Sequence, residues 1–136
     1  MDVKRWLSRA KRIDEQIDRL VNLRDAERER IMKVTQTISG DIVQTTKDPH
    51  KFDKLAEYED RLDQMIDRLY DTKTEILDVI AQITDSRYRD ILIGRYLDGL
   101  TFEEIAVQIK YSYKQTCRLH GRALLKVLEV LDEKDV

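Results

Sequence analysis

Apolar residues recur at alternating intervals of three and four along two long stretches of the chain, residues 3–34 and residues 55–83. In the first stretch, eight of ten such positions are apolar, and Arg24 and Glu27 are the exceptions. In the second stretch, only Thr72 is polar among nine positions. This spacing is typical of a heptad seam, so we expect two long helices that each require a helical partner.

The connection between these stretches, residues 35–51, loses the heptad and contains Gly40 and the only proline, Pro49. Such a segment is long enough to reverse the chain. The sequence therefore predicts an antiparallel coiled-coil hairpin over residues 1–84, which dimerises or binds a partner. Further apolar positions are left to cover a second subunit or the C-terminal helices: Leu7, Val21, Ile66 and Ile80. We expect a homodimer or higher oligomer formed through these helices.

A second domain is predicted over residues 85–136, again all-α. Asp85 is suited to cap a helix that ends at Gly99. Thr101 and Glu104 have the spacing of a capping box, which begins a short helix.

A tight turn at residues 110–112 is expected to follow this short helix. Ser112 then caps a last, longer helix over residues 113–131. Two capped helices, the first short and the second long, follow the plan of a helix-turn-helix unit.

The exposed positions on the first turns of the last helix are candidates for DNA contact. In a recognition helix, glutamine suits adenine, arginine suits guanine or phosphate, lysine suits phosphate, and tyrosine suits phosphate or a thymine methyl. The candidate DNA-binding residues are Tyr113, Lys114, Gln115, Arg118, Arg122 and Lys126.

Charge is distributed unevenly along the chain. The 136 residues carry 25 basic and 27 acidic side chains, a net charge of −2. Residues 87–126 nevertheless hold 8 basic and 4 acidic side chains, a net charge of +4, whereas residues 1–86 and 127–136 are each at −3. The positive charge thus coincides with the predicted DNA-binding segment.

Other compositional features restrict the function classes. Cys117 is the only cysteine and His50 and His120 are the only histidines, so we expect no disulfide within the chain, no zinc and no other metal or cofactor. The sequence contains no nucleophile–base pair or phosphate-binding loop, which argues against an enzyme. Without a long apolar run or signal peptide, we expect a cytoplasmic protein that does not span a membrane.

Two resemblances accompany these patterns. Residues 100–127 resemble region 4 of sigma-70-type initiation factors, through an LT-x-EEIA helix and an AL-x-K tail. The chain departs from that pattern at Lys110, where glycine is frequent, and at Thr116, where valine or isoleucine is commoner. Nothing in the chain resembles the parts of a sigma factor that melt a promoter.

The whole chain resembles a family of small phage and prophage proteins of Gram-positive bacteria. The shared motifs are SGD-x-VQ at residues 39–44, RY-x-x-IL-x-x-RY-x-x-G at residues 87–99 and YSY-x-x-x-x-RLHG-x-AL at residues 111–124. Members are described as sigma-like or late-operon transcription regulators. This resemblance implies a sequence-specific regulator, an activator in our interpretation, that binds double-stranded DNA.

Alternatives remain at this stage. The chain could be a sigma-like adaptor that binds RNA polymerase or another protein without reading DNA, or a DNA-packaging recognition subunit. His120 is interpreted either as a phosphate contact or as a packed side chain, and Cys117 as a buried apolar residue or a redox switch.

Overall fold

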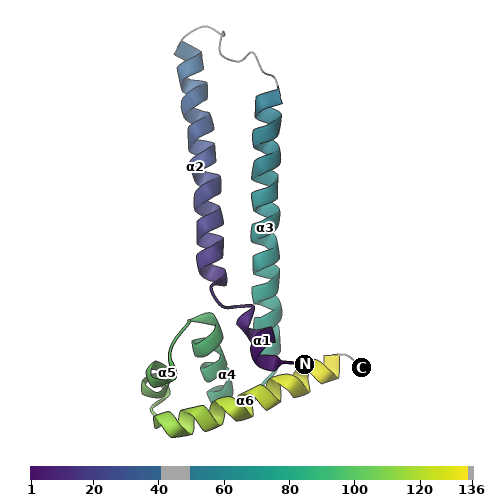
Figure 1. The fold of residues 1–136 in the computed structure, drawn as a ribbon, viewed down its shortest axis with the longest axis vertical. Coiled ribbons are helices and arrows are strands. Elements are labelled where there is room, and N and C mark those ends of the chain that lie inside the picture. The colour runs from purple at the N-terminus through teal and green to yellow at the C-terminus, as the bar shows by residue number, and fades with distance from the viewer. Residues whose placement is uncertain (41–49, 135–136) are drawn as a thin grey trace. The chain divides into compact units, whose positions relative to one another are not determined.

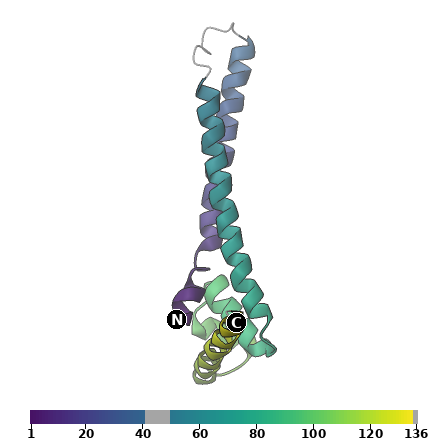
Figure 2. The ribbon, with the colours of Figure 1, turned by 90° about the vertical axis from the view of Figure 1, so that its right-hand side faces the viewer.

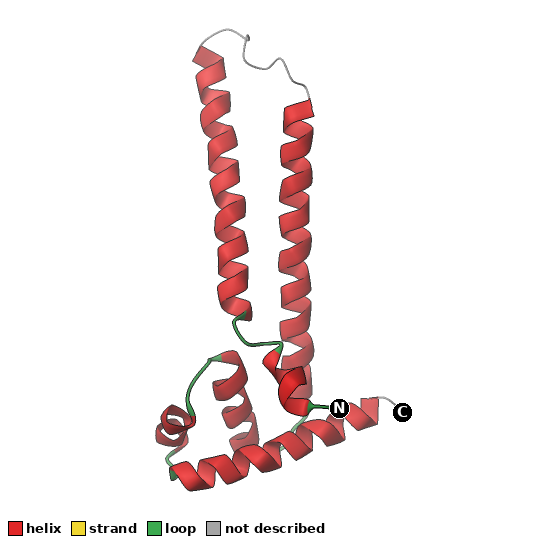
Figure 3. Cartoon of the chain, viewed as in Figure 1, coloured by secondary structure: helices red, strands yellow, loops and turns green. Residues whose placement is uncertain are grey.

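The computed structural model describes residues 1–40 and 50–134, and the side chains of residues 1–33 and 53–134. Every regular element in these residues is helical, and they include no strand (Figure 3). The all-α fold class is confirmed for this part of the chain. Residues 41–49 of the predicted connection, with most of the SGD-x-VQ motif, lie outside the described residues, as do the side chain of Val34 and residues 135–136.

The elements follow one another as in Figure 1. Their bounds are α1 Val3–Ser8, α2 Ile13–Gly40, α3 His50–Ala81, α4 Ser86–Leu92, the π-helical η1 Ile93–Leu97, α5 Phe102–Ile109 and α6 Tyr113–Lys134. They divide into two compact units, residues 14–69 and residues 1–13 together with 70–136. The second unit thus takes in more of the chain than the residues 85–136 expected from the sequence.

In the unit of residues 14–69, α2 and α3 run side by side in opposite directions, as both views of the chain show (Figures 1 and 2). Helix α2 continues to Gly40 and α3 begins at His50, so the prediction of a loop was wrong for residues 35–40 and 50–51. The serine and threonine residues of that segment lower helix propensity by only tenths of a kcal/mol each, roughly. Without an internal glycine or proline before residue 40, they do not stop the helix.

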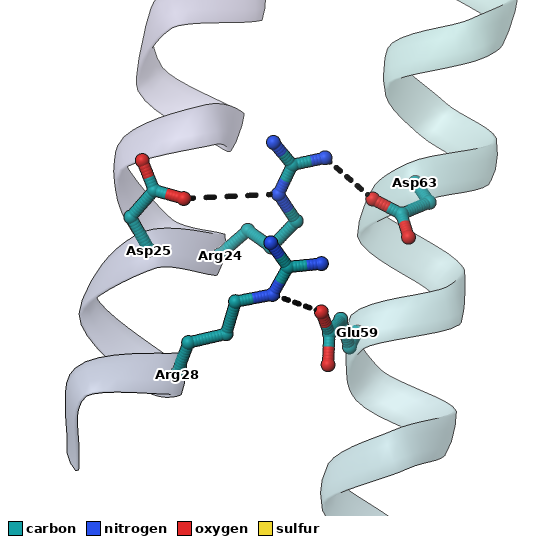
Figure 4. A network of polar contacts seen from close by, with 5 residues as sticks. All are labelled: Arg24, Asp25, Arg28, Glu59 and Asp63. Carbon is teal, nitrogen blue, oxygen red and sulfur yellow. Dashed lines mark hydrogen bonds and ion pairs between the residues drawn. The ribbon is translucent and has the colours of Figure 1, made fainter. Parts of the chain in front are cut away.

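This pair of helices carries both buried apolar residues and ion pairs. Ile17, Leu62 and Ile66 are buried. At the predicted break in the first seam, the Arg24 Nη1 donates to Asp63 Oδ1 at 2.7 Å, and Arg28 Nε donates to Glu59 (Figure 4). The hydrogen bond with Asp63 raises the pKa of Arg24.

The two ion pairs have a defined register. Arg28 follows Arg24 by four residues, whereas its partner Glu59 precedes Asp63 by four residues (Figure 4). This order is that of antiparallel helices, because each helical turn forward on one corresponds to a turn backward on the other. The charged pairs therefore mark the alignment of α2 against α3.

The chain near the N-terminus differs from the single long helix that the heptad predicts. Helix α1 ends at Ser8, and α2 begins at Ile13 after a break in which Arg12 adopts a φ of 64°. Such a left-handed residue stops a helix. The sequence pattern did not reveal the break because apolar residues keep the same spacing across it. These residues are all buried: Val3, Leu7, Ala10 and Ile13.

Helices α4, α5 and α6 share one apolar core, to which α1 is added by packing on α6. Ile91, Ile105 and Leu119 lie at its centre. Partly buried side chains surround them, namely Tyr88, Leu100, Phe102, Ile109 and Tyr111. The core thus fixes α5 against the N-terminal part of α6.

The end of the helix predicted to stop at Gly99 is π-helical. The Asp98 N–H donates to Ile93 O at 2.9 Å and the Leu100 N–H to Gly94 O at 2.9 Å, while Gly99 has a φ of 71°. Gly94 is buried, and a Cβ there would lie 3.1 Å from Cγ1 of Ile105. Glycine therefore lets η1 approach α5 closely.

Candidate nucleic-acid interface

The candidate interface begins with the N-terminus of α5, which is held by reciprocal hydrogen bonds. The Glu104 N–H donates to Oγ1 of Thr101 at 3.2 Å, and the Thr101 N–H donates to Oε1 of Glu104 at 3.4 Å. Both residues of the predicted capping box thus occupy their expected places. The caps satisfy N–H groups that a helix start would otherwise leave without a partner.

A short turn connects α5 to α6. Lys110 ends α5 in a left-handed conformation, with φ 63° and ψ 39°. The N–H groups of Lys110 and Tyr111 both donate to Ala106 O, the second at 3.1 Å. The chain therefore changes direction within residues 110–112, even though lysine stands where glycine would be less strained.

The first turn of α6 is fixed by Ser112, the third predicted cap. Its Oγ accepts a hydrogen bond from the Gln115 N–H at 3.1 Å. Its carbonyl accepts from the Thr116 N–H at 2.9 Å and from the Thr116 hydroxyl at 2.8 Å. Thr116 is fully buried, and its hydrogen bond to Ser112 satisfies a hydroxyl that valine or isoleucine would not have.

The predicted DNA-binding side chains all lie on the exposed part of α6. All six are exposed: Tyr113, Lys114, Gln115, Arg118, Arg122 and Lys126. Lys114, Arg118 and Arg122 follow one another at intervals of four and form a stripe along the helix. The opposite side of α6 carries its buried positions, among them Leu119 and Ala123.

The positive charges of this stripe are not paired with carboxylates of the described residues. In the part of the chain that the structure describes, Lys114, Arg118 and Arg122 pair with no carboxylate. Lys126 differs, because its Nζ lies 3.5 Å from Oε2 of Glu129. The first turns of α6 thus present three free cations together with the amide of Gln115.

Tyr113 adds a hydroxyl to this surface, at 53% relative exposure. A hydrogen bond with the half-buried Cys117 raises the pKa of Tyr113. The phenol therefore stays protonated near neutral pH and retains its O–H donor.

His120 does not belong to the exposed surface. It is 7% exposed, its Nε2 lies 2.9 Å from the hydroxyl of Tyr96, and its ring meets Phe102 edge-on at 4.8 Å. Burial, followed by the charges of Lys4 and Arg95, lowers the pKa of His120 to about 4. Of the two interpretations, the structure favours packing.

Some side-chain contacts next to the candidate interface had no signal in the sequence. The guanidinium of Arg95 lies 4.4 Å from the ring centroid of Phe102, and its Nη1 donates to Leu100 O at 3.2 Å. Tyr96 meets His120 across 24 positions of the chain. Helical periodicity relates neighbours three or four residues apart, so it carries no information on such pairs.

No family model matches the sequence, and comparison with curated proteins and with solved structures found no match. Among the described residues, no three His, Cys, Asp or Glu side chains gather as metal ligands would. None of the helices described is both long enough and apolar enough to cross a membrane.

Proposed function

We propose that the protein is a sequence-specific DNA-binding transcription regulator in which α5 and α6 act as a helix-turn-helix unit. Helix α6 enters the major groove with its first turns. Tyr113, Lys114, Gln115 and Arg118 read or position the groove, while Arg122 and Lys126 bind phosphate.

One observation carries the proposal: the stripe of Lys114, Arg118 and Arg122 is exposed and lacks carboxylate partners. A cation on a helix surface can pair with an acidic residue three or four positions away, as Lys126 does with Glu129. Within the described residues, the three cations of the stripe make no such pair. Free cations at the start of a helix fixed by a short turn suit a phosphate backbone.

In this proposal α2 and α3 form a coiled-coil hairpin that dimerises. A single module with few phosphate contacts binds weakly at physiological salt, and a dimer doubles those contacts. Tyr58 and Met65, seven positions apart on α3, are 42% and 47% exposed, so α2 leaves part of the second seam uncovered. Sedimentation of the wild type and of a Tyr58→Lys/Met65→Lys variant tests this point, and a monomeric wild type would remove the dimer from the proposal.

The DNA-binding proposal is tested by titration against fragments of the chromosomal neighbourhood of the coding sequence, at two salt concentrations. The test variant is Lys114→Ala/Arg118→Ala. The matched control is Arg19→Ala/Lys54→Ala, which removes one arginine and one lysine from exposed positions of α2 and α3.

We expect a fragment-specific, salt-sensitive complex for the wild type and the control. The test variant should lose about 10-fold or more in affinity, and the slope of log K against log salt should fall by about two. Equal binding by both variants would overturn the proposal. Co-purification with RNA polymerase, without a DNA complex, would instead favour the sigma-like adaptor. A large ring in solution would favour the DNA-packaging subunit.

A further inference from the structure

A cavity of about 220 Å³ lies within the unit formed by residues 1–13 and 70–136. One wall comes from α1 and the residues after it, through Lys4, Ser8 and Lys11. The Ser8 hydroxyl donates to Lys4 O at 2.6 Å, and both lysines are exposed. This wall therefore offers two exposed ammonium groups.

The facing wall is more rigid. It contains Arg95 and Tyr96 of η1, Phe102 of α5 and His120 of α6. Arg95 is oriented by the carbonyl of Leu100 and by the Phe102 ring, and the Tyr96 hydroxyl shares a hydrogen bond with His120. The guanidinium of Arg95 is thus held in place before any ligand arrives.

The charges around the cavity have one sign. Lys4, Lys11 and Arg95 line it, and none of the described lining residues has a carboxylate. The carboxylate of Asp2 acts on Tyr96, and it also caps α1 by accepting from the Arg5 N–H at 3.2 Å. Like charges gathered in a partly enclosed space repel one another and attract a counter-charge.

We propose that this cavity is a binding site for a small phosphorylated ligand. Three cationic groups match the charge and the oxygens of a phosphate, with Arg95 able to bind two oxygens at once. A water in the liquid occupies about 30 Å³, so the cavity has room for a phosphate and a few further atoms beside Phe102. The ligand would join α1 to η1, α5 and α6.

The site lies on a different side of α6 from Arg118, a residue of the DNA-binding surface proposed above. Successive residues of a helix differ by about 100°, so the two-residue step from Arg118 to His120 leaves their side chains about 160° apart around α6. A phosphate in the cavity and a DNA backbone on the Arg118 side therefore do not compete. The inference does not depend on the proposed function.

The test is a calorimetric titration of the full chain with inorganic phosphate and with pyrophosphate, up to about 10 mM at a constant ionic strength near 0.15 M. The test variant is Lys4→Gln/Lys11→Gln. The control Lys54→Gln/Lys134→Gln removes the same charge from exposed positions that do not line the cavity. Circular dichroism verifies that both variants keep the helical content of the wild type.

We expect saturable binding of at least one probe by the wild type and the control, and a loss of about 10-fold or more in the cavity variant. The His120 ring gives a second readout by NMR in the unaltered chain. A bound anion offsets Lys4 and Arg95, so the pKa of His120 should rise from about 4 when the probe is added.

Four results would overturn the inference, the first three of which concern the probes themselves. These three are no saturable binding of either probe, equal binding by the cavity variant, and no response of His120 to a bound probe. Displacement of the probe by short duplex DNA would also overturn it, since the phosphate recognised would then belong to the DNA backbone.

Discussion

The hydroxyl of Tyr96 in η1 lies 2.9 Å from Nε2 of His120 in α6, and both side chains are buried. Their rings are stacked with centroids 5.8 Å apart. Burial raises the pKa of Tyr96 and lowers that of His120, so both groups are neutral near pH 7. The pair is a neutral hydrogen bond between two elements far apart in the sequence.

This pair predicts a loss of stability in acid. The unfolded chain binds a proton at the ordinary histidine pKa of about 6.5, whereas folded His120 binds it only at about 4. Stability contributed by the neutral imidazole is therefore present above pH 6.5 and is lost as the pH falls toward 4. We expect the free energy of unfolding to decrease by about 2 kcal/mol from this group between pH 7 and pH 4.5, measured by urea denaturation.

A His120→Gln variant separates this effect from the protonation of carboxylates. Glutamine can keep a hydrogen bond with Tyr96 but does not titrate. The difference in stability between the wild type and this variant should change with pH between 7 and 4.5. A constant difference would show that His120 does not titrate with a lowered pKa.

Two glycines provide a paired prediction on packing. A Gly94→Ala substitution places a Cβ 3.1 Å from Ile105, which is fully buried and cannot move away freely, so we expect destabilisation by about 1–3 kcal/mol. At Gly121 in α6 nothing lies within 4 Å of such a Cβ. Gly121→Ala should instead stabilise by up to about 1 kcal/mol, through helix propensity. Thermal unfolding of both variants measures the contrast, and equal effects would contradict the close approach of η1 to α5.

The helices and their caps were the part that the sequence predicted well. The Thr101–Glu104 and Ser112 caps depend on neighbours three residues apart, so their spacing carried the information. The break before Ile13 escaped prediction because it depends on one backbone angle at Arg12. Periodicity also could not show that α1 belongs with the C-terminal helices.

The sequence likewise predicted one part of the candidate site and not another. The exposure of Lys114, Arg118 and Arg122 follows from the helical spacing of the buried residues of α6, such as Leu119 and Ala123. The cavity escaped prediction, since Lys4 and Arg95 are 91 positions apart in the chain and meet only through tertiary packing.

The ion pairs between α2 and α3 predict a charge-swap result. Reversing one member, as in Asp63→Arg, places like charges beside Arg24 and should lower the unfolding temperature. The double variant Arg24→Asp/Asp63→Arg should recover part of that loss, because the attraction is restored with its direction exchanged. A double variant that is less stable than the sum of both single changes would rule out a direct contact.

The turn between α5 and α6 supports the last prediction. Lys110 adopts φ 63° and ψ 39°, a conformation that costs a residue with a Cβ about 1 kcal/mol relative to glycine. Lys110→Gly should therefore raise the free energy of unfolding by up to about 1 kcal/mol, less the greater chain entropy that glycine gives the unfolded state. Lys110→Ala is the control, because it removes the same charge and keeps the Cβ. We expect the glycine variant to exceed the alanine variant in stability by chemical denaturation, and equal stabilities would argue that Lys110 does not hold a left-handed conformation.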